Sequence, residues 1–211
     1  MVFRRSALLL LSGLIVCGAA AGCADPEGEF DAFGQRYVEI HGSSTTTTTT
    51  PTGACTLPEA GEIDGDHLLT LAVKLNPQKP VMFLAGVTTT AMGDGLGLSF
   101  KLQALDKADR KTPVGDATDV GPYEVNADGS FVADFPPLPV PAEANAITGS
   151  AITADVTLTG SLCVGELVCG ALDGTAVLNI DGSAFTLQKI EDPSSYPDAV
   201  INCAGDVAPL E

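Results

Sequence analysis

The amino-acid sequence predicts an all-β domain, an antiparallel β-sandwich or flattened barrel of about eight or nine strands. Three observations lead to this prediction. Apolar and polar residues alternate with a period of two in several segments, which is typical of strands with one buried face. The dipeptide Asp-Gly, which suits tight turns, occurs five times between or beside such segments. No segment longer than a turn or two shows the 3.6-residue period of a helix.

The alternation is clearest in two segments. In "LGLSFKLQAL" (Leu96–Leu105) every second residue from Leu96 to Ala104 is apolar, and "AITADVTLTG" (Ala151–Gly160) repeats the pattern. Further strands are predicted at Leu68–Leu75, Tyr123–Ala127, Ser130–Phe135 and Gly174–Ile180.

Two Asp-Gly turns predict hairpins. "YEVNADGSFVADF" is expected to turn at Asp128-Gly129, and "TAVLNIDGSAFTL" at Asp181-Gly182, so that each strand pairs with its successor. The segment "FPPLPVPAEAN" (Phe135–Asn145) is rich in proline, which cannot donate to a central ladder. We therefore expect it to be a crossover between strands.

The N-terminus has the features of an export signal. Arg4 and Arg5 precede an apolar run, Ala7–Gly22, of 16 residues, which is shorter than the 20 or so that a membrane-spanning helix needs. This length and charge pattern is typical of a secretory signal peptide. The run ends in "AAGC", which resembles the lipobox of bacterial lipoproteins.

The lipobox resemblance covers about 23 residues and implies that Cys23 is lipid-modified and becomes the mature N-terminus. It implies an extracytoplasmic protein anchored to the bacterial membrane through Cys23. Ala24 follows the cysteine, and Asp25 comes one residue too late to resemble the inner-membrane retention signal. The sequence therefore favours the outer membrane, on its surface or its periplasmic side.

The sequence divides into three parts. Residues 1–22 are the predicted signal peptide, and residues 23–54 are the lipidated cysteine and a low-complexity tether. The tether contains six consecutive threonines, Thr45–Thr50, and cannot bury enough apolar surface to fold, so it is expected to be disordered. Residues 55–211 are predicted to be a single β domain stapled by disulfides.

The composition excludes one class of partner. The net charge is −17, and removal of Arg4 and Arg5 with the signal peptide lowers it to −19. A chain with this charge repels phosphate backbones, so nucleic acid is excluded as a partner. The predicted partners are the membrane, through the lipid at Cys23, and a protein or a glycan.

The cysteines are expected to form disulfides because an exported chain folds in an oxidising compartment. After lipidation of Cys23, Cys55, Cys163, Cys169 and Cys203 remain, and four cysteines allow three pairings. The spacing of "SLCVGELVCG" fits a hairpin with a three-residue turn in which Cys163 lies opposite Cys169. The sequence therefore predicts the pairs Cys163–Cys169 and Cys55–Cys203.

No residue pattern identifies a chemical site. Acidic turns such as Asp64–Asp66 and Asn126–Asp128 lack the further ligands of a calcium loop, and hairpin turns explain them without a metal. The two histidines, His41 in the tether and His67 at a strand entrance, have no motif beside them that marks a nucleophile. We therefore predict no catalytic residue, metal site or cofactor, and the sequence leaves the ligand-binding residues unassigned.

Two functions remain open at this point. The first is a lipid-anchored envelope or surface lipoprotein whose β domain binds a ligand or has a structural role without catalysis. The second is a periplasmic or surface hydrolase of the glycosidase kind that uses carboxylates from strand ends. Two neighbouring carboxylates in a cavity would favour the hydrolase.

Overall fold

The computed structural model describes residues 55–209, which form an antiparallel β structure. The strands are β1 (Gly65–Ala72), β2 (Val81–Met92), β3 (Gly95–Ala104), β4 (Thr118–Val125), β5 (Ser130–Asp134), β6 (Leu138–Val140), β7 (Ile152–Ser161), β8 (Val168–Thr175) and β9 (Ser183–Lys189).

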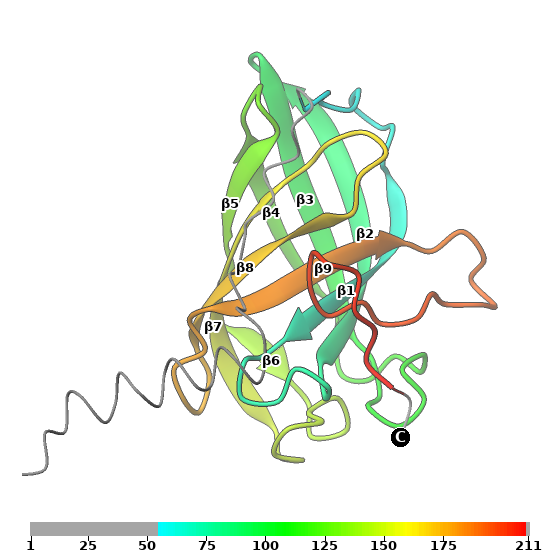
Figure 1. Ribbon diagram of the computed structural model, residues 1–211, viewed down its shortest axis with the longest axis vertical. Helices are drawn as coiled ribbons and strands as arrows, with labels where there is room; N and C mark the ends of the chain where they lie inside the picture. Colours follow the sequence, from blue (N-terminus) through cyan, green and yellow to red (C-terminus); the bar gives the residue numbers. More distant parts are fainter. Residues whose placement is uncertain (1–54, 210–211) are drawn as a thin grey trace, which may run out of the picture. The chain divides into compact units, whose positions relative to one another are not determined.

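Eight of these strands close into a barrel (Figure 1). Strands β1 to β5 pair in chain order, β5 pairs with β7, β7 with β8 and β8 with β9. The barrel closes where β9 pairs antiparallel with β1. The short strand β6 pairs with the start of β7, next to the stretch of β7 that pairs with β5. The all-β prediction is confirmed, in its barrel form.

Most of the predicted strands are confirmed, and one is wrong. The segments at Leu96–Leu105 and Ala151–Gly160 correspond to β3 and β7, and the hairpin at Asp128-Gly129 joins β4 to β5. The predicted strand Gly174–Ile180 does not form, because β8 ends at Thr175 and β9 begins only at Ser183. The intervening residues 176–182 form a loop, which we call the β8–β9 loop.

The main core fills the barrel, and a second apolar cluster lies outside it. On β1, Leu69 and Leu71 belong to the main core, whereas Leu68 and Ala72 belong to the second cluster. Successive residues of a strand point to opposite faces, so the second cluster lies on the outer face of β1. This cluster is covered by residues of the C-terminal segment, namely Ile190, Ala199, Ile201 and Ala208. This double burial explains why every residue of β1 from His67 to Ala72 is buried, on both faces of the strand.

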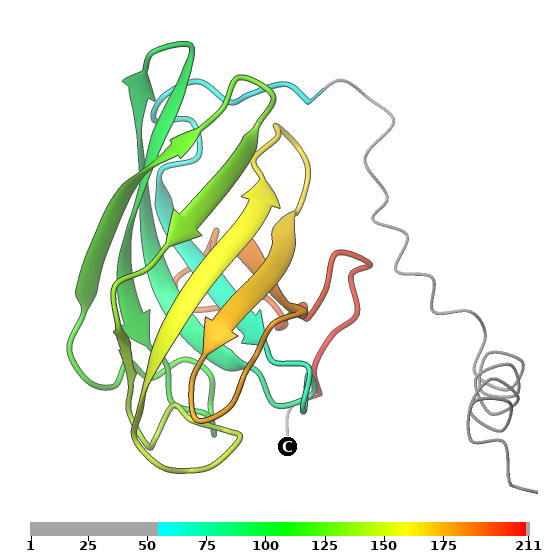
Figure 2. The same cartoon turned by 90° about the vertical axis from the view of Figure 1, so that its left-hand side faces the viewer.

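The barrel has two unlike ends, at the top and bottom of Figures 1 and 2. We call one the closed end, where the β2–β3, β4–β5 and β7–β8 connections lie. Residues 55–64 cover it: Leu57 and Ile63 pack against the main core, and the Asp64 carboxylate accepts hydrogen bonds from the backbone and hydroxyl of Thr89. We call the other the open end, where the β1–β2, β3–β4, β6–β7 and β8–β9 connections lie.

The disulfide pairing predicted from the sequence is wrong. Cys55 bonds to Cys163, 108 residues apart, and Cys169 bonds to Cys203, 34 residues apart. The first bond joins residues 55–64 to the β7–β8 connection at the closed end, and the second joins the C-terminal segment to β8. Two disulfides within one domain are compatible with folding outside the cytoplasm.

The register of β7 and β8 explains the error. Ser161, not Cys163, lies opposite Cys169. The chain leaves the β7–β8 ladder after Ser161, because the Leu162 backbone N–H donates to the carbonyl of Gly129 and Leu162 is buried. The Val164 N–H then donates to the carbonyl of Thr56. These bonds carry Cys163 away from β8 and place it beside Cys55.

Candidate functional site: an apolar pocket at the open end

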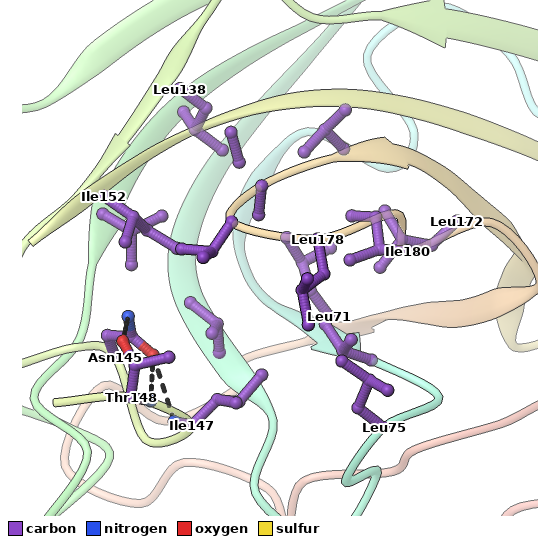
Figure 3. Close-up of a pocket in the computed structure, with 17 residues that line it drawn as sticks. Leu71, Leu75, Leu138, Asn145, Ile147, Thr148, Ile152, Leu172, Leu178 and Ile180 are labelled. Atoms are coloured by element: carbon purple, nitrogen blue, oxygen red, sulfur yellow. Dashed lines mark hydrogen bonds between the residues drawn. The ribbon is translucent and has the colours of Figure 1, made fainter. Parts of the chain in front are cut away.

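A pocket of about 110 Å³ lies at the open end of the barrel (Figure 3). Its wall is formed by the ends of β1 and β2, by β6, β7 and β8, and by the β6–β7 and β8–β9 loops. In Figure 3, Leu138 and Ile152 lie on one side of it and Leu172 and Ile180 on the other. An eight-stranded barrel is just wide enough for its side chains or for one small ligand, so a free volume at one end is consistent with this architecture.

The lining is almost wholly aliphatic. Of 17 lining residues, 15 are Leu, Ile, Val or Ala, and the other two are Asn145 and Thr148. Aromatic rings fill other parts of the core, where Phe131 meets Phe185 edge-on at 6.1 Å between ring centres. No aromatic ring, carboxylate, amine, imidazole or thiol occurs among the described residues that line the pocket.

Asn145 is the buried polar residue of the lining, and its hydrogen bonds are all made within the β6–β7 loop. Its side-chain amide donates to the Thr148 hydroxyl at 2.6 Å and to the Ser150 carbonyl at 2.8 Å. Its carbonyl oxygen accepts from the backbone N–H groups of Ile147 and Thr148, each at 3.0 Å. A side-chain amide has two donor hydrogens and two acceptor sites, so Asn145 has none left for a ligand.

The β8–β9 loop is braced by two Asp-Gly pairs that bond to each other. The Asp173 carboxylate accepts from the Gly182 N–H, and the Asp181 carboxylate accepts from the Gly174 N–H, both at 2.9 Å. The Asn179 side chain also donates to Asp181, and these two bonds lower the pKa of Asp181 below its ordinary value. The two carboxylates therefore shape the pocket wall without lining the pocket.

Three exposed apolar residues surround the mouth of the pocket, and we call them the rim. Leu75 from the β1–β2 loop is 57% exposed, and Val177 and Leu178 from the β8–β9 loop are 65% and 60% exposed. The closed end also has exposed apolar residues, Val164 and Leu167, but neither lines the pocket. Single exposed apolar residues are normal, whereas a group beside a cavity indicates a binding surface.

The residues considered from the sequence lie elsewhere. His67 is buried near the closed end, where its Nδ1–H donates to the Gly65 carbonyl. Tyr123 is partly buried and packs against the main core, and Tyr196 packs against the second cluster. The Asp128 carboxylate accepts from the backbone and hydroxyl of Ser130. The predicted lipidation site Cys23 and the tether histidine His41 lie outside the described residues.

The pocket was missed by the sequence analysis, and the signal for part of it was misread. The alternation of Ala176, Leu178 and Ile180 was interpreted as a strand, although these residues line the pocket from a loop. Asn145 had no distinguishing signal, because an asparagine after a proline-rich stretch is ordinary in a loop.

Comparison with known proteins finds no matching family model, no matching curated protein and no matching solved structure. Within residues 55–209, no cluster of three or more His, Cys, Asp or Glu side chains is placed to hold a metal ion. The same residues contain no helix of the length and hydropathy needed to cross a membrane.

Proposed function

We propose that this chain is a lipid-anchored envelope lipoprotein whose β domain binds the apolar part of a small molecule without chemically converting it. The lipobox-like "AAGC" at Cys23 supports the anchor, and the two disulfides are consistent with an extracytoplasmic location. The residues after Cys23, Ala24 and Asp25, favour the outer membrane as the membrane that holds the anchor. The observation that carries the binding role is the aliphatic pocket at the open end.

The same pocket favours binding over hydrolysis. A glycosidase needs two carboxylates facing a cavity, and none of the described residues that line this pocket is acidic. A sugar also needs hydrogen-bond partners, whereas the buried amide of Asn145 is fully bonded within its own loop. An apolar group needs neither, and its transfer from water into such a pocket is favourable.

Calorimetric titration with 1-octanol tests this proposal. The protein is the full chain with Cys23→Ser, which cannot be lipidated. We expect one octanol to bind per chain, and Ala154→Leu to weaken binding at least tenfold because Ala154 lines the pocket. Ala176→Leu, from the wall loop, is the second pocket-filling variant in case Ala154→Leu does not fold. Ala171→Leu is the matched control, because Ala171 is exposed and does not line the pocket.

Two results would contradict the proposal. One is the absence of octanol binding, or binding that both pocket-filling variants leave unchanged. The other is turnover of an ester or glycoside that is lost in Asp173→Asn or Asp181→Asn, the carboxylates of the pocket wall. That second result would support the hydrolase instead.

A further inference from the structure

We infer that the ligand of this pocket is the aliphatic tail of an uncharged molecule, which enters tail-first and leaves its polar head outside the rim. This inference rests on the proposed binding function and specifies the class of ligand. It combines the polarity of the lining, the volume of the pocket, the position of the rim and the charge around the mouth.

The lining restricts the inner part of the ligand to hydrocarbon. A polar group buried without a hydrogen-bond partner is costly, and the buried Asn145 has no free donor or acceptor to offer. The other polar lining residue, Thr148, is exposed, so it can meet only a group near the mouth. The absence of aromatic rings from the described lining also removes any stacking surface for a planar ring.

The volume sets how much of the tail is enclosed. An apolar cavity of about 150 Å³ binds one benzene molecule, so by proportion the pocket of about 110 Å³ encloses roughly four carbon atoms. A longer tail must continue past the mouth. There it meets Leu75, Val177 and Leu178, which are more than half exposed and can cover the next few methylene groups.

The charges near the mouth favour an uncharged head. Lys74 and Lys79 lie in the β1–β2 loop of the open end, and Lys107, Arg110 and Lys111 lie in its β3–β4 loop. The side-chain amines of Lys74 and Lys107 donate to the backbone carbonyls of Asp181 and Ala142 respectively. The acidic residues of this end nearly balance these positive charges, and they are Asp106, Asp109, Asp116, Glu143, Asp173 and Asp181. In a chain of net charge −17, an anionic head gains little here and is repelled at longer range.

A chain-length series tests the inference on the Cys23→Ser chain. We expect the Kd of straight-chain alcohols to fall about fourfold per methylene up to roughly four carbons, the equivalent of about 0.8 kcal/mol each. For longer tails the gain per methylene becomes smaller and ends once the rim is passed. Octanoate is expected to bind at least tenfold more weakly than octanol.

A rim variant separates the two parts of the tail. In Val177→Ser/Leu178→Ser, octanol binding is expected to weaken more than butanol binding, because both residues line the pocket but only the longer tail continues over their exposed parts. Val132→Ser is the matched control, since Val132 is 57% exposed on β5 and does not line the pocket.

The outcomes distinguish this inference from the proposed function. If no alcohol binds, both fail. If octanol binds but octanoate binds equally well, or chain length has no effect, or the rim variant weakens butanol as much as octanol, only the ligand class is wrong. The same octanol titration is repeated on the lipidated chain. If the lipidated chain binds no octanol while the Cys23→Ser chain does, the protein's own acyl chain fills the pocket. That result would exclude a separate ligand.

Discussion

The two ends of this barrel differ in whether their apolar side chains are shielded from water. At the closed end, residues 55–64 cross the barrel, Leu57 and Ile63 pack on the core, and a disulfide holds Cys55 to Cys163. At the open end the rim residues Leu75, Val177 and Leu178 remain exposed beside the pocket mouth.

The difference shows where the molecule tolerates unburied apolar surface. Covering apolar groups is favourable, and the closed end shows that this chain does so with about ten residues and one disulfide. At the open end, the loops that form the pocket wall are instead fixed by their own hydrogen bonds, those of Asn145 and of the Asp173 and Asp181 pairs. An open apolar pocket with fixed walls suits ligand binding better than it suits stability alone.

The largest effect is expected at the closed end. Replacing both Cys55 and Cys163 with alanine should lower the free energy of unfolding by about 4–5 kcal/mol, because the bond closes a loop of 108 residues. Chemical denaturation measures this change. Octanol binding to the fraction that remains folded should be unaltered, since the pocket is at the other end. Loss of binding in a folded double variant would show that the two ends are coupled.

At the open end, the variant with the largest expected effect is Asn145→Ala. It removes four hydrogen bonds and leaves the N–H groups of Ile147 and Thr148 without this partner, at a cost of about 2–3 kcal/mol. The wall of the pocket loosens, so octanol binding should weaken with the stability. Thermal unfolding and calorimetry measure both. Unchanged binding in a destabilised variant would contradict the role of Asn145 in shaping the pocket.

The smallest effects on stability and octanol affinity are expected from a change of pH, and they differ between the two ends. Burial lowers the pKa of His67 near the closed end, and the Lys189 charge adds to this, while its hydrogen bond to Gly65 and the Asp66 charge oppose it. The unfolded chain therefore binds a proton more readily at this histidine. Stability from His67 is complete above pH 6.5, its ordinary pKa, and falls as the pH decreases below it.

The Asp181 carboxylate at the open end takes up its proton in a lower pH range than His67 does. The pKa of Asp181 is lowered from 3.8, so its bonds to the β8–β9 loop persist above that pH and are lost as the pH falls through the lowered value. Between pH 7 and pH 5 we expect a stability loss that His67→Gln reduces, with octanol affinity constant. Below about pH 4 octanol affinity should fall, less so in Asp181→Asn. A reversed order of the two changes would contradict this assignment.

The sequence was sufficient for the fold class because the alternation in β3 and β7 is regular and the Asp128-Gly129 turn is local. Its failures have a common cause in contacts between distant residues. The disulfide pairing depends on the bonds of Leu162 to Gly129 and of Val164 to Thr56, which bring three separate segments together. No spacing within "SLCVGELVCG" contains that information.

The pocket was hidden for a related reason. Periodicity shows that alternate residues share a face, but it does not show whether a strand partner exists beside them. Ala176–Ile180 has the alternation of a strand, yet the bonds from Asp173 to Gly182 and from Asp181 to Gly174 hold it as a loop. The barrel's closure through β9 and β1, which places this loop at the mouth, is also a long-range property.

The most direct test of the central claim is to record where octanol perturbs the backbone amides of the isotope-labelled Cys23→Ser chain by NMR. We expect perturbed amides around the pocket, at Leu71, Ile147, Ile152, Ala176 and Leu178, and unperturbed amides at Leu57, Ile63 and Leu162 of the closed end. Perturbations confined to the closed end or to the outer cluster around Leu68 and Ile201, or none at saturating octanol, would contradict the account.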